Sequence, residues 1–382
     1  MRHNGFYIFL AIFLSIYVLL NYYVGRRGWL LFSYWFPWLD RKFYWVVFWL
    51  LALAYLIGRL GKRFLPWLDS WGFTMLGSWW MGAFYYLLLS LIIFDLIKFV
   101  LGRMGLWPNS LTPILGLGLF LFIVGLLVYG FYNARQPVVR TYAVNINKPG
   151  GQLDSLKVVM LSDLHLGRIN HKQRLEQAVR QINTIKPDLV LLVGDIIDED
   201  TAPFIEQKMA DAFRQLHSRY GVYAVTGNHE YIGGEAERAV AALREAGITV
   251  LRDEAVFVAN SLYLIGREDQ VKERFTGKKR KPLAEIIKNL DRHKPMLLMD
   301  HQPRQLEESL MAGIDLQVSG HTHRGQLWPN NYLTSRIYEV DWGYYRKGSL
   351  QVVVSSGYGT WGPPFRIGNQ PEIVVLQLSF QK

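Results

Sequence analysis

The sequence of 382 residues contains no cysteine. This absence excludes disulfide bonds and thiolate metal ligands, so any metal ion must be held by the oxygen and nitrogen ligands of Asp, Glu, Asn or His. It does not decide the redox compartment in which the protein works.

Acidic residues are scarce in the first third of the chain. Residues 1–133 contain ten Lys or Arg but only three acids, whereas residues 134–382 contain thirty-two basic and twenty-eight acidic residues. The net charge of +11 therefore divides into +7 and +4. Most of the basic excess flanks apolar runs, which is typical of membrane-flanking charge and not of a nucleic-acid-binding face.

Four long apolar runs in this region predict transmembrane helices, because about 18 to 20 apolar residues span a bilayer. They cover residues 6–24, 43–60, 71–101 and 111–132. Trp and Tyr cluster near their ends, as in an aromatic belt. In the fourth run, Gly116, Gly118, Gly125 and Gly130 predict close helix packing. A buried, soluble all-α domain is disfavoured. We expect a multi-pass protein of the cell membrane, with the side of the membrane left open because flanking charges are nearly balanced.

The pattern changes after residue 133. Residues 134–152 predict a polar linker, since they contain two prolines and a Gly-Gly pair. In residues 153–382, apolar β-like runs first alternate with helical patterns, including one helix over residues 205–216, and later segments are mainly strands. We expect an α/β domain in which two sheets pack face to face with helices outside. The predicted domains are thus 1–133 and 153–382.

Five polar clusters in the second domain each follow a β-like run, where the carboxyl ends of strands collect ligands. The clusters contribute Asp163 and His165, Asp195, Asn228 and His229, His301, and His321 and His323. Such a set of oxygen and nitrogen donors is too large for one ion and suits two divalent ions. Two ions stabilise the attacking and leaving oxygens of an in-line phosphoryl displacement, and a hydroxide held between them is the nucleophile.

The ordered motifs Asp-x-His, Gly-Asp-x-x-Asp, Gly-Asn-His-Glu, a lone His before Pro, and Gly-His-x-His resemble the calcineurin-like metallophosphoesterase family. The resemblance covers about residues 153–382, and residues 355–368 resemble the end of its membrane-associated branch, which joins transmembrane helices to this domain. It implies the two-sheet fold of the family, flanked by helices, and a hydrolase that depends on two divalent metals, with Mn, Fe, Zn and Co left open.

The resemblance also implies a role for each residue. The first metal would be bound by Asp163, His165 and His323, the second by Asn228, His301 and His321, with Asp195 bridging. His229 would contact the phosphoryl group and protonate the leaving oxygen. Candidates for orienting these ligands are Asp198, Glu230 and Asp300.

Two basic features of the sequence can each be interpreted in two ways. Arg324 stands where members of this branch often have glycine, and it either contacts a substrate phosphate or points to solvent. The basic segment 272–281 is either a solvated loop or a site that docks on anionic lipid headgroups.

These observations predict a membrane-embedded phosphohydrolase that cleaves a phosphoester or pyrophosphate bond. Because a soluble substrate would not need four membrane spans, we expect a lipid or lipid-linked substrate, with membrane lipids as partners. A protein phosphatase or nuclease of the same family is an alternative, although the nearly balanced charge of the second domain offers no groove for nucleic acid. A non-catalytic membrane sensor or scaffold is a further alternative. Substrate, metal identity and oligomeric state are not determined by the sequence.

Overall fold

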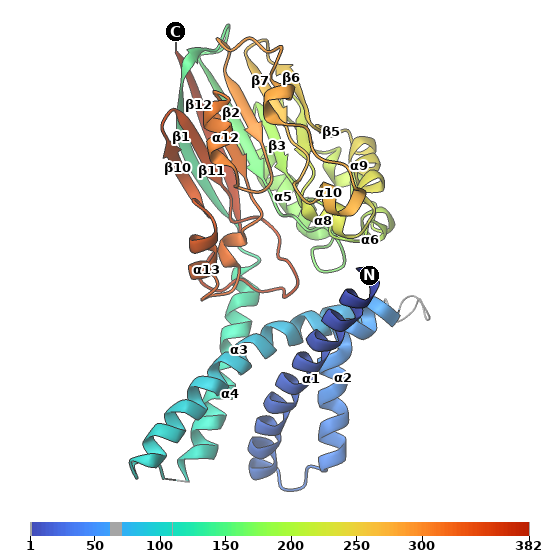
Figure 1. Ribbon diagram of the computed structural model, residues 1–382, viewed down its shortest axis with the longest axis vertical. Coiled ribbons are helices and arrows are strands. Elements are labelled where there is room, and N and C mark those ends of the chain that lie inside the picture. The colour runs from blue at the N-terminus through green and yellow to red at the C-terminus, as the bar shows by residue number, and fades with distance from the viewer. Residues whose placement is uncertain (1, 62–70, 109, 382) are drawn as a thin grey trace. The chain divides into compact units, whose positions relative to one another are not determined.

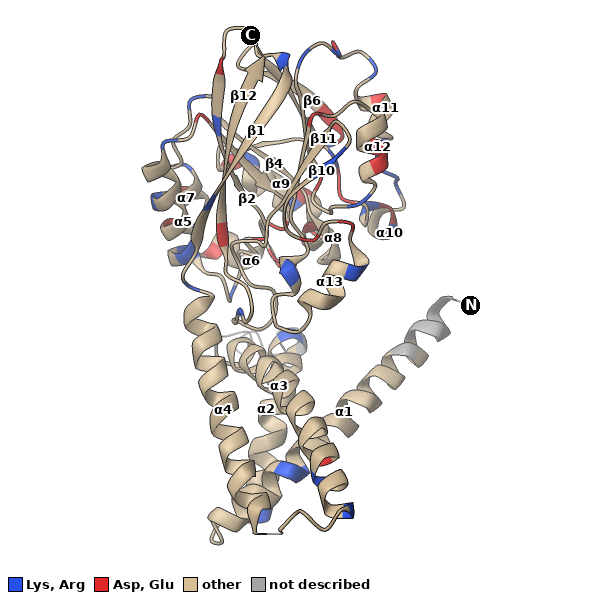
Figure 2. Ribbon diagram, turned by 90° about the vertical axis from the view of Figure 1, so that its left-hand side faces the viewer, with Lys and Arg blue, Asp and Glu red and all other residues tan. Residues whose placement is uncertain are grey.

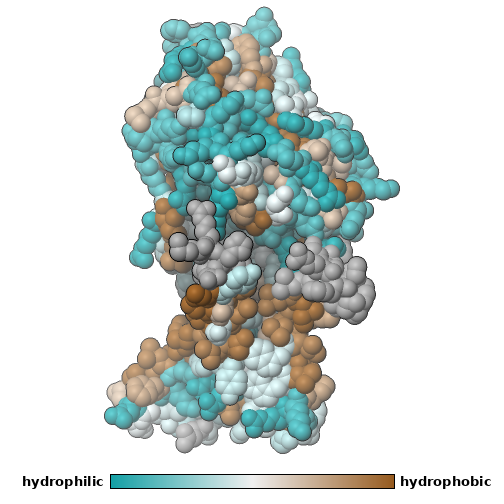
Figure 3. All heavy atoms as spheres, turned by 45° about the vertical axis from the view of Figure 1, so that its right-hand side comes forward, coloured by the Kyte–Doolittle hydropathy of each residue, from teal (hydrophilic) through white to brown (hydrophobic). Residues whose placement is uncertain are grey.

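The computed structural model describes residues 2–61, 71–108 and 110–381. It divides into a helical unit, residues 1–130 with 362–364, and an α/β unit, residues 131–361 with 365–382 (Figure 1). Lys, Arg, Asp and Glu are frequent in the α/β unit and few in the helical unit (Figure 2). Much of the visible face of the helical unit is correspondingly hydrophobic (Figure 3). The α/β unit is therefore rich in charged residues, whereas the helical unit has few of them and a largely apolar surface.

The helical unit consists of α1 (Arg2–Trp35), α2 (Arg41–Gly61), α3 (Trp71–Arg103) and α4 (Leu111–Asn133). All four predicted runs lie within these helices. Within the described ranges, three segments are long and apolar enough to cross a membrane, namely Arg41–Arg59, Gly72–Arg103 and Leu111–Asn133. The first run, residues 6–24, is part of α1 but not among these three, so its membrane crossing stays a prediction. The helix α1 also continues beyond Arg26 and Arg27, where the apolar run ends.

Close packing of α2 against α3 depends on small residues. A β-carbon at Gly77 would collide with the backbone of Tyr55, and one at Gly58 would crowd Thr74. By contrast, a β-carbon at Gly118 or Gly125 of α4 would meet no atom of the described residues within 4 Å. Close packing at these two glycines therefore stays a prediction, because glycine spacing shows where helices can approach but not which partner does.

We expect Gly77→Leu to destabilise the helical unit. The new side chain would push against the backbone of α2, which cannot rotate away as a side chain can, so the cost should reach or exceed the usual overpacking penalty of about 1–3 kcal/mol. Thermal unfolding in detergent measures the effect, with Gly118→Leu as the control of equal size. Equal melting temperatures for the two variants would contradict this packing.

The α/β unit contains two mixed sheets of six strands each. The first has the order β1 (Val138–Pro149), β12 (Glu372–Gln381), β2 (Ser155–Leu161), β3 (Leu189–Val193), β4 (Val222–Val225) and β5 (Thr249–Val250). The second has the order β10 (Gly343–Lys347), β11 (Leu350–Val354), β9 (Leu316–Ser319), β8 (Met296–Met299), β7 (Leu262–Gly266) and β6 (Glu254–Val258). Strands β2, β3 and β4 run parallel, as do β7, β8 and β9, so their carboxyl ends share an edge in each sheet.

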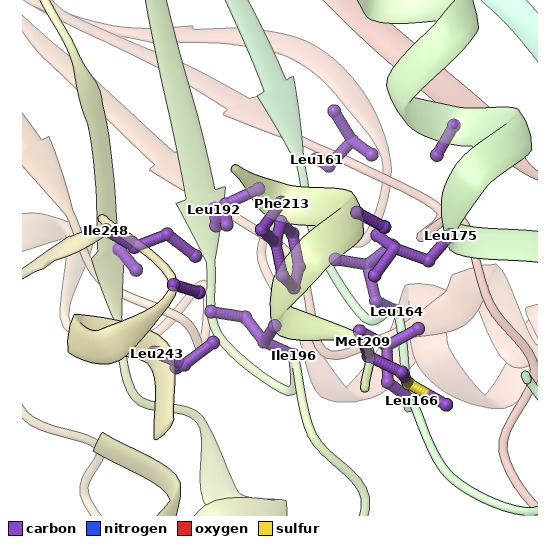
Figure 4. Close-up of a cluster of buried hydrophobic side chains, with 14 of the residues drawn as sticks. Leu161, Leu164, Leu166, Leu175, Leu192, Ile196, Met209, Phe213, Leu243 and Ile248 are labelled. Carbon is purple, nitrogen blue, oxygen red and sulfur yellow. The ribbon is translucent and has the colours of Figure 1, made fainter. Parts of the chain in front are cut away.

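Alternating side chains build the layers of this unit. In β2, Val158 and Met160 belong to one buried cluster, with residues of both sheets, whereas Val159 and Leu161 belong to another on the opposite face. The second cluster lies under α5 (Lys172–Ile185), α7 (Ala210–Phe213) and α9 (Ala236–Glu245) (Figure 4). Over the second sheet, a third cluster involves α11 (Leu283–Ile286) and α12 (Leu306–Met311). The predicted architecture of two facing sheets with helices outside is confirmed.

The remaining helical segments are short. They are α6 (Ala202–Glu206), α8 (Asn228–Ile232), α10 (Lys272–Thr276), α13 (Asn331–Ile337) and a 3-10 helix, His323–Gly325. The single helix predicted over residues 205–216 is wrong, because the chain forms α6 and α7 with Lys208 between them at φ 52°. A left-handed residue interrupts a right-handed helix.

The predicted linker needs a correction in structure. Residues 134–152 include β1, which pairs in parallel with β12. Only alternate residues of β1 turn inward, and only Val144 and Ile146 among the apolar ones are buried, so the segment resembles a polar connector in sequence. Strand β10 was likewise not predicted. The domain bounds 1–133 and 153–382 stay a prediction.

Candidate metal centre

The predicted ligands lie in five loops at the carboxyl ends of strands or at the start of the short helix that follows such a loop. The loops follow β2 (Asp163, His165), β3 (Asp195), β4 (Asn228, His229), β8 (His301) and β9 (His321, His323). Three of these strands come from the first sheet and two from the second. The two sheets thus contribute to one cluster of buried or nearly buried polar side chains.

The backbone at this cluster adopts an uncommon conformation. Positive φ angles occur at Asp163 (55°), His165 (44°), Asp195 (49°), His321 (71°) and His323 (48°). Residues other than glycine pay roughly 1–3 kcal/mol for such a conformation, and it collects at functional sites. The backbone conformation of these loops therefore follows from the positions that their side chains occupy and not from local backbone preference.

Asp163, His165 and His323 form the first ligand group. One ligand atom of each lies within 4.8 Å of the others. The two Nε2 atoms of His165 and His323 are 3.0 Å apart, and His323 Nε2 is 3.4 Å from Asp163 Oδ1. Two imidazole nitrogens and a carboxylate oxygen therefore face one small volume.

Asp195, His301 and His321 form the second ligand group, again within 4.8 Å. Asp195 Oδ2 lies 3.1 Å from His301 Nε2 and 3.8 Å from His165 Nε2. Asp195 therefore stands between the two groups. Asn228 is nine-tenths buried, and its side-chain oxygen has no hydrogen-bond partner among the residues that the structure describes.

These residues fit two divalent cations. The donors are carboxylate, amide and imidazole groups, a set that accepts Mn, Fe, Zn or Co. The buried atom Asn228 Oδ1 lacks a hydrogen bond within the described part of the chain. Leaving a buried polar atom unsatisfied costs about 1–3 kcal/mol, which a coordinated cation would offset.

Burial keeps two of the imidazoles neutral. It lowers the pKa of His321 to about 3, and that of His323 well below the ordinary 6.5. Burial alone would raise the pKa of Asp195, but the neighbouring His301 and His229 outweigh it and hold that pKa well below the ordinary value. Neutral imidazole and ionised carboxylate are the forms that bind metal.

Neighbouring groups fix the orientation of the ligands. His301 Nδ1 lies 2.8 Å from the carbonyl oxygen of Val193, and the carboxylate of Asp163 accepts from the backbone N–H of His321 at 3.0 and 3.1 Å. Arg366, which is fully buried, places Nη2 3.3 Å from His323 Nδ1. Such contacts around a ligand restrict its rotation and position its binding atom.

His229 lies beside both ligand groups, at the start of α8. Its backbone N–H donates to Asp195 Oδ1 at 2.9 Å, and its Nδ1 lies 2.9 Å from Asp198 Oδ1. Burial alone would lower the pKa of His229, but the carboxylates of Asp195 and Asp198 outweigh it and raise that pKa to about 9. The raised pKa favours the protonated ring, which is the form that can donate a proton.

The three acids predicted to orient ligands separate into different roles. Asp198 contacts His229, as described. Glu230 accepts from the backbone N–H groups of Ile196, Ile197 and Gly227 at 2.7, 2.9 and 2.7 Å, so it supports the loop that carries Asp195. Asp300 accepts from Arg280 at 3.0 and 3.1 Å. Sequence position beside a ligand did not distinguish these cases.

Some of the basic side chains noted in the sequence contact other residues of the α/β unit. The guanidinium carbon of Arg324 lies 3.8 Å from the centre of the Trp342 ring. In the basic segment, Lys272 pairs with Glu268 at 3.2 Å and Arg280 pairs with Asp300, whereas Lys278 and Lys279 are exposed. A substrate contact by Arg324 and lipid docking by residues 272–281 stay predictions.

Two residues of the segment 355–368 lie near the site but received no role in the sequence analysis. They are Arg366, whose contact with His323 is given above, and Trp361, whose ring centre lies 5.8 Å from that of His229. Only the contact distances distinguish them from other residues of the segment, because both lie far from their partners in the sequence.

The family model and the sequence relatives that match this chain name the same kind of protein. The model of the calcineurin-like phosphoesterase family matches residues 156–325, which include every predicted metal ligand. A metallophosphoesterase of Campylobacter jejuni is 30% identical over 389 residues, covering 99% of this chain and 100% of that protein. A transmembrane protein with metallophosphoesterase domain from Bos taurus is 32% identical over 268 residues, covering 66% of this chain and 60% of that protein. A 5'-nucleotidase precursor from Thermus thermophilus is 14% identical with a TM-score of 0.36, covering 59% of this chain and 54% of that one.

Proposed function

The chain belongs to the calcineurin-like phosphoesterase family, and from this premise we propose that it is a membrane-embedded hydrolase of a phosphoester or pyrophosphate bond in a lipid or lipid-linked substrate. Membership in the family makes it a metal-dependent phosphoester hydrolase. The lipid character of the substrate and the role of each residue are the proposal.

The ligand assignment follows the two groups of side chains. In the proposal, Asp163, His165 and His323 would hold one divalent cation and Asn228, His301 and His321 the other, with Asp195 shared between them. When bound, the two cations supply Lewis acidity and a water nucleophile that is activated at neutral pH. The chain's own contribution is to hold these ligands in fixed orientations.

His229 is the proposed general acid. Its raised pKa favours the protonated imidazole, and Asp198 holds Nδ1, so the proton on the other ring nitrogen is available for a leaving oxygen. Asn228 and Arg324 are proposed to contact the phosphoryl group, Asn228 through its amide and Arg324 through its guanidinium.

The observation that carries the lipid proposal is the end of α4, which lies within the α/β unit. The side-chain amide of Asn133, the last residue of α4, donates to the backbone oxygens of Arg366 and Asn369 at 2.9 and 2.7 Å. Arg366 in turn contacts His323. An apolar segment long enough to span a bilayer therefore ends two contacts away from a proposed metal ligand. A water-soluble substrate would gain nothing from this connection.

Exposed apolar side chains near the site support the same proposal. Trp361, next to His229, is 55% exposed, and Trp328 and the α13 residues Tyr332, Leu333 and Ile337 are also exposed. Trp and Tyr favour the membrane–water interface. An amphiphile with its phosphate at the metal centre can place its apolar chain against Trp361.

Reconstituted full-length protein in lipid nanodiscs tests the proposal. We expect hydrolysis of lipid monophosphates or lipid-linked diphosphates to exceed that of the same headgroups without the chain by at least about tenfold, the gain from burying two methylene groups. Trp361→Ser should reduce this preference, whereas Met311→Ser, which removes an exposed apolar side chain from the end of α12, should preserve it. Equal rates with and without the chain, unchanged in Trp361→Ser, would remove the lipid proposal while leaving the phosphohydrolase.

A further inference from the structure

A cavity in the helical unit lies outside the metal centre and plays no part in the proposed reaction. Its volume is about 710 Å³, and residues of α1, α2, α3 and α4 line it. That volume falls within the range of about 300–1,000 Å³ that ligand sites occupy. Most of the wall is apolar or aromatic, including Phe32, Phe48, Leu87 and Phe120. The cavity can therefore accommodate the acyl chain of a lipid.

The same cavity contains a charged cluster. Arg27, Asp95 and Lys98 line it, so two cations stand against one carboxylate. Arg27 forms an ion pair with Asp95 Oδ2, and the hydroxyl of Tyr23 donates to that oxygen at 2.7 Å. The cluster therefore retains one positive charge. Ionisable residues inside transmembrane helices are costly and mark functional sites.

One oxygen of this cluster is available as an acceptor. Asp95 Oδ1 is buried and has no hydrogen-bond partner among residues 2–61, 71–108 and 110–381. A buried acceptor without a donor is unfavourable by roughly 1–3 kcal/mol, so a ligand that brings a hydroxyl to this oxygen would be favoured. The cavity thus presents a positive charge, an unused acceptor and an apolar wall together.

We propose that this cavity binds an anionic phospholipid whose headgroup carries a hydroxyl, of the phosphatidylglycerol class. The phosphate pairs with Arg27 and Lys98, a headgroup hydroxyl donates to Asp95 Oδ1, and an acyl chain lies against the aromatic wall. A zwitterionic headgroup would bring a cation toward the excess positive charge, and a headgroup without a hydroxyl would leave the Asp95 oxygen unsatisfied.

The bound lipid is distinct from a substrate at the metal centre. The residues that line the cavity belong to the helical unit, whereas the proposed metal ligands belong to the α/β unit. The inference does not rest on the proposed hydrolysis of lipids.

Native mass spectrometry of the full-length protein in detergent tests the inference by titration with three lipids of matched chains. We expect phosphatidylglycerol to bind about fivefold or more tightly than phosphatidylcholine, the effect of one basic residue on an anionic headgroup. Phosphatidylmethanol, which has the charge but no hydroxyl, should bind more weakly than phosphatidylglycerol. Equal binding of phosphatidylglycerol and phosphatidylcholine would overturn the proposal, and equal binding of the two anionic lipids would overturn the role of Asp95.

Matched variants locate the site. Lys98→Gln should abolish the preference for the anionic lipids, whereas Arg103→Gln, five residues further along α3 and outside the cavity wall, should retain it. Leu119→Trp should weaken binding of phosphatidylglycerol because it fills the apolar wall. Retained hydrolysis of a chromogenic phosphodiester shows that the variants are folded. The same preference in Lys98→Gln and Arg103→Gln, or full binding by Leu119→Trp, would overturn the assignment to this cavity.

Discussion

Asp195→Asn is expected to abolish phosphohydrolase activity and to reduce the metal content from two ions to one or none. Asp195 Oδ2 lies 3.1 Å from His301 and 3.8 Å from His165, so the carboxylate stands between both ligand groups. Asparagine retains the shape and an acceptor oxygen for the backbone N–H of His229, but it lacks the negative charge that two cations share. We expect a loss in kcat of at least about a hundredfold, as for removal of a single electrostatic contact at an active site.

Metal analysis of the purified protein and hydrolysis of a chromogenic phosphodiester measure these two effects independently. Asp211→Asn, which makes the same substitution at an exposed position of α7, is the control and should retain both metals and activity. Unfolding measurements distinguish lost binding from lost structure. If Asp195→Asn kept two ions and wild-type activity, Asp195 would not bridge and the assignment of both ligand groups would fail.

His229→Gln is expected to reduce kcat while both metals stay bound. A positioned general acid contributes about 10²- to 10⁴-fold, so a loss of that size is expected on substrates with an alkoxide leaving group. A nitrophenolate leaves without a proton, and its hydrolysis should fall much less. His293→Gln, in an exposed loop, is the matched control. Equal losses on both classes of leaving group would contradict a proton-donating role.

The pH dependence of the wild type follows from the raised pKa of His229. Activity that needs the protonated ring falls as pH rises through that pKa, which is about 9 in the protein without metal. Bound cations would bring this pKa back toward neutral pH because they repel the imidazolium. We therefore expect a descending alkaline limb in the wild type that is absent in His229→Gln. The comparison is made with an alkyl phosphate substrate under constant metal saturation.

The raised pKa also has a consequence for stability of the metal-free protein. A base whose pKa rises on folding stabilises the folded state fully below its unfolded pKa, here 6.5, and loses this contribution as pH rises through about 9. Relative to His229→Gln, the metal-free wild type should therefore lose stability between these two values. Unfolding by denaturant at several pH values measures the difference.

The sequence by itself determined the types of residue at the site and the edge on which they meet. Each motif follows an apolar run, and parallel strands deliver the loops after β2, β3, β4, β8 and β9 to one place. Helical and strand periodicity are local, because they depend on residues a few positions apart. The helices of the first third and most strands of the α/β unit were therefore predictable.

Only the tertiary structure decided which neighbours of the ligands act on them. Asp198 contacts His229 whereas Glu230 binds three backbone N–H groups, although both lie next to predicted ligand motifs. The strand β1 was hidden because its exposed alternate residues resemble a connector, and it is defined by pairing with β12 more than two hundred residues away. Likewise, Arg27 and Asp95 meet across α1 and α3. Contacts between residues far apart in the chain depend on how elements pack, and no local pattern encodes that packing.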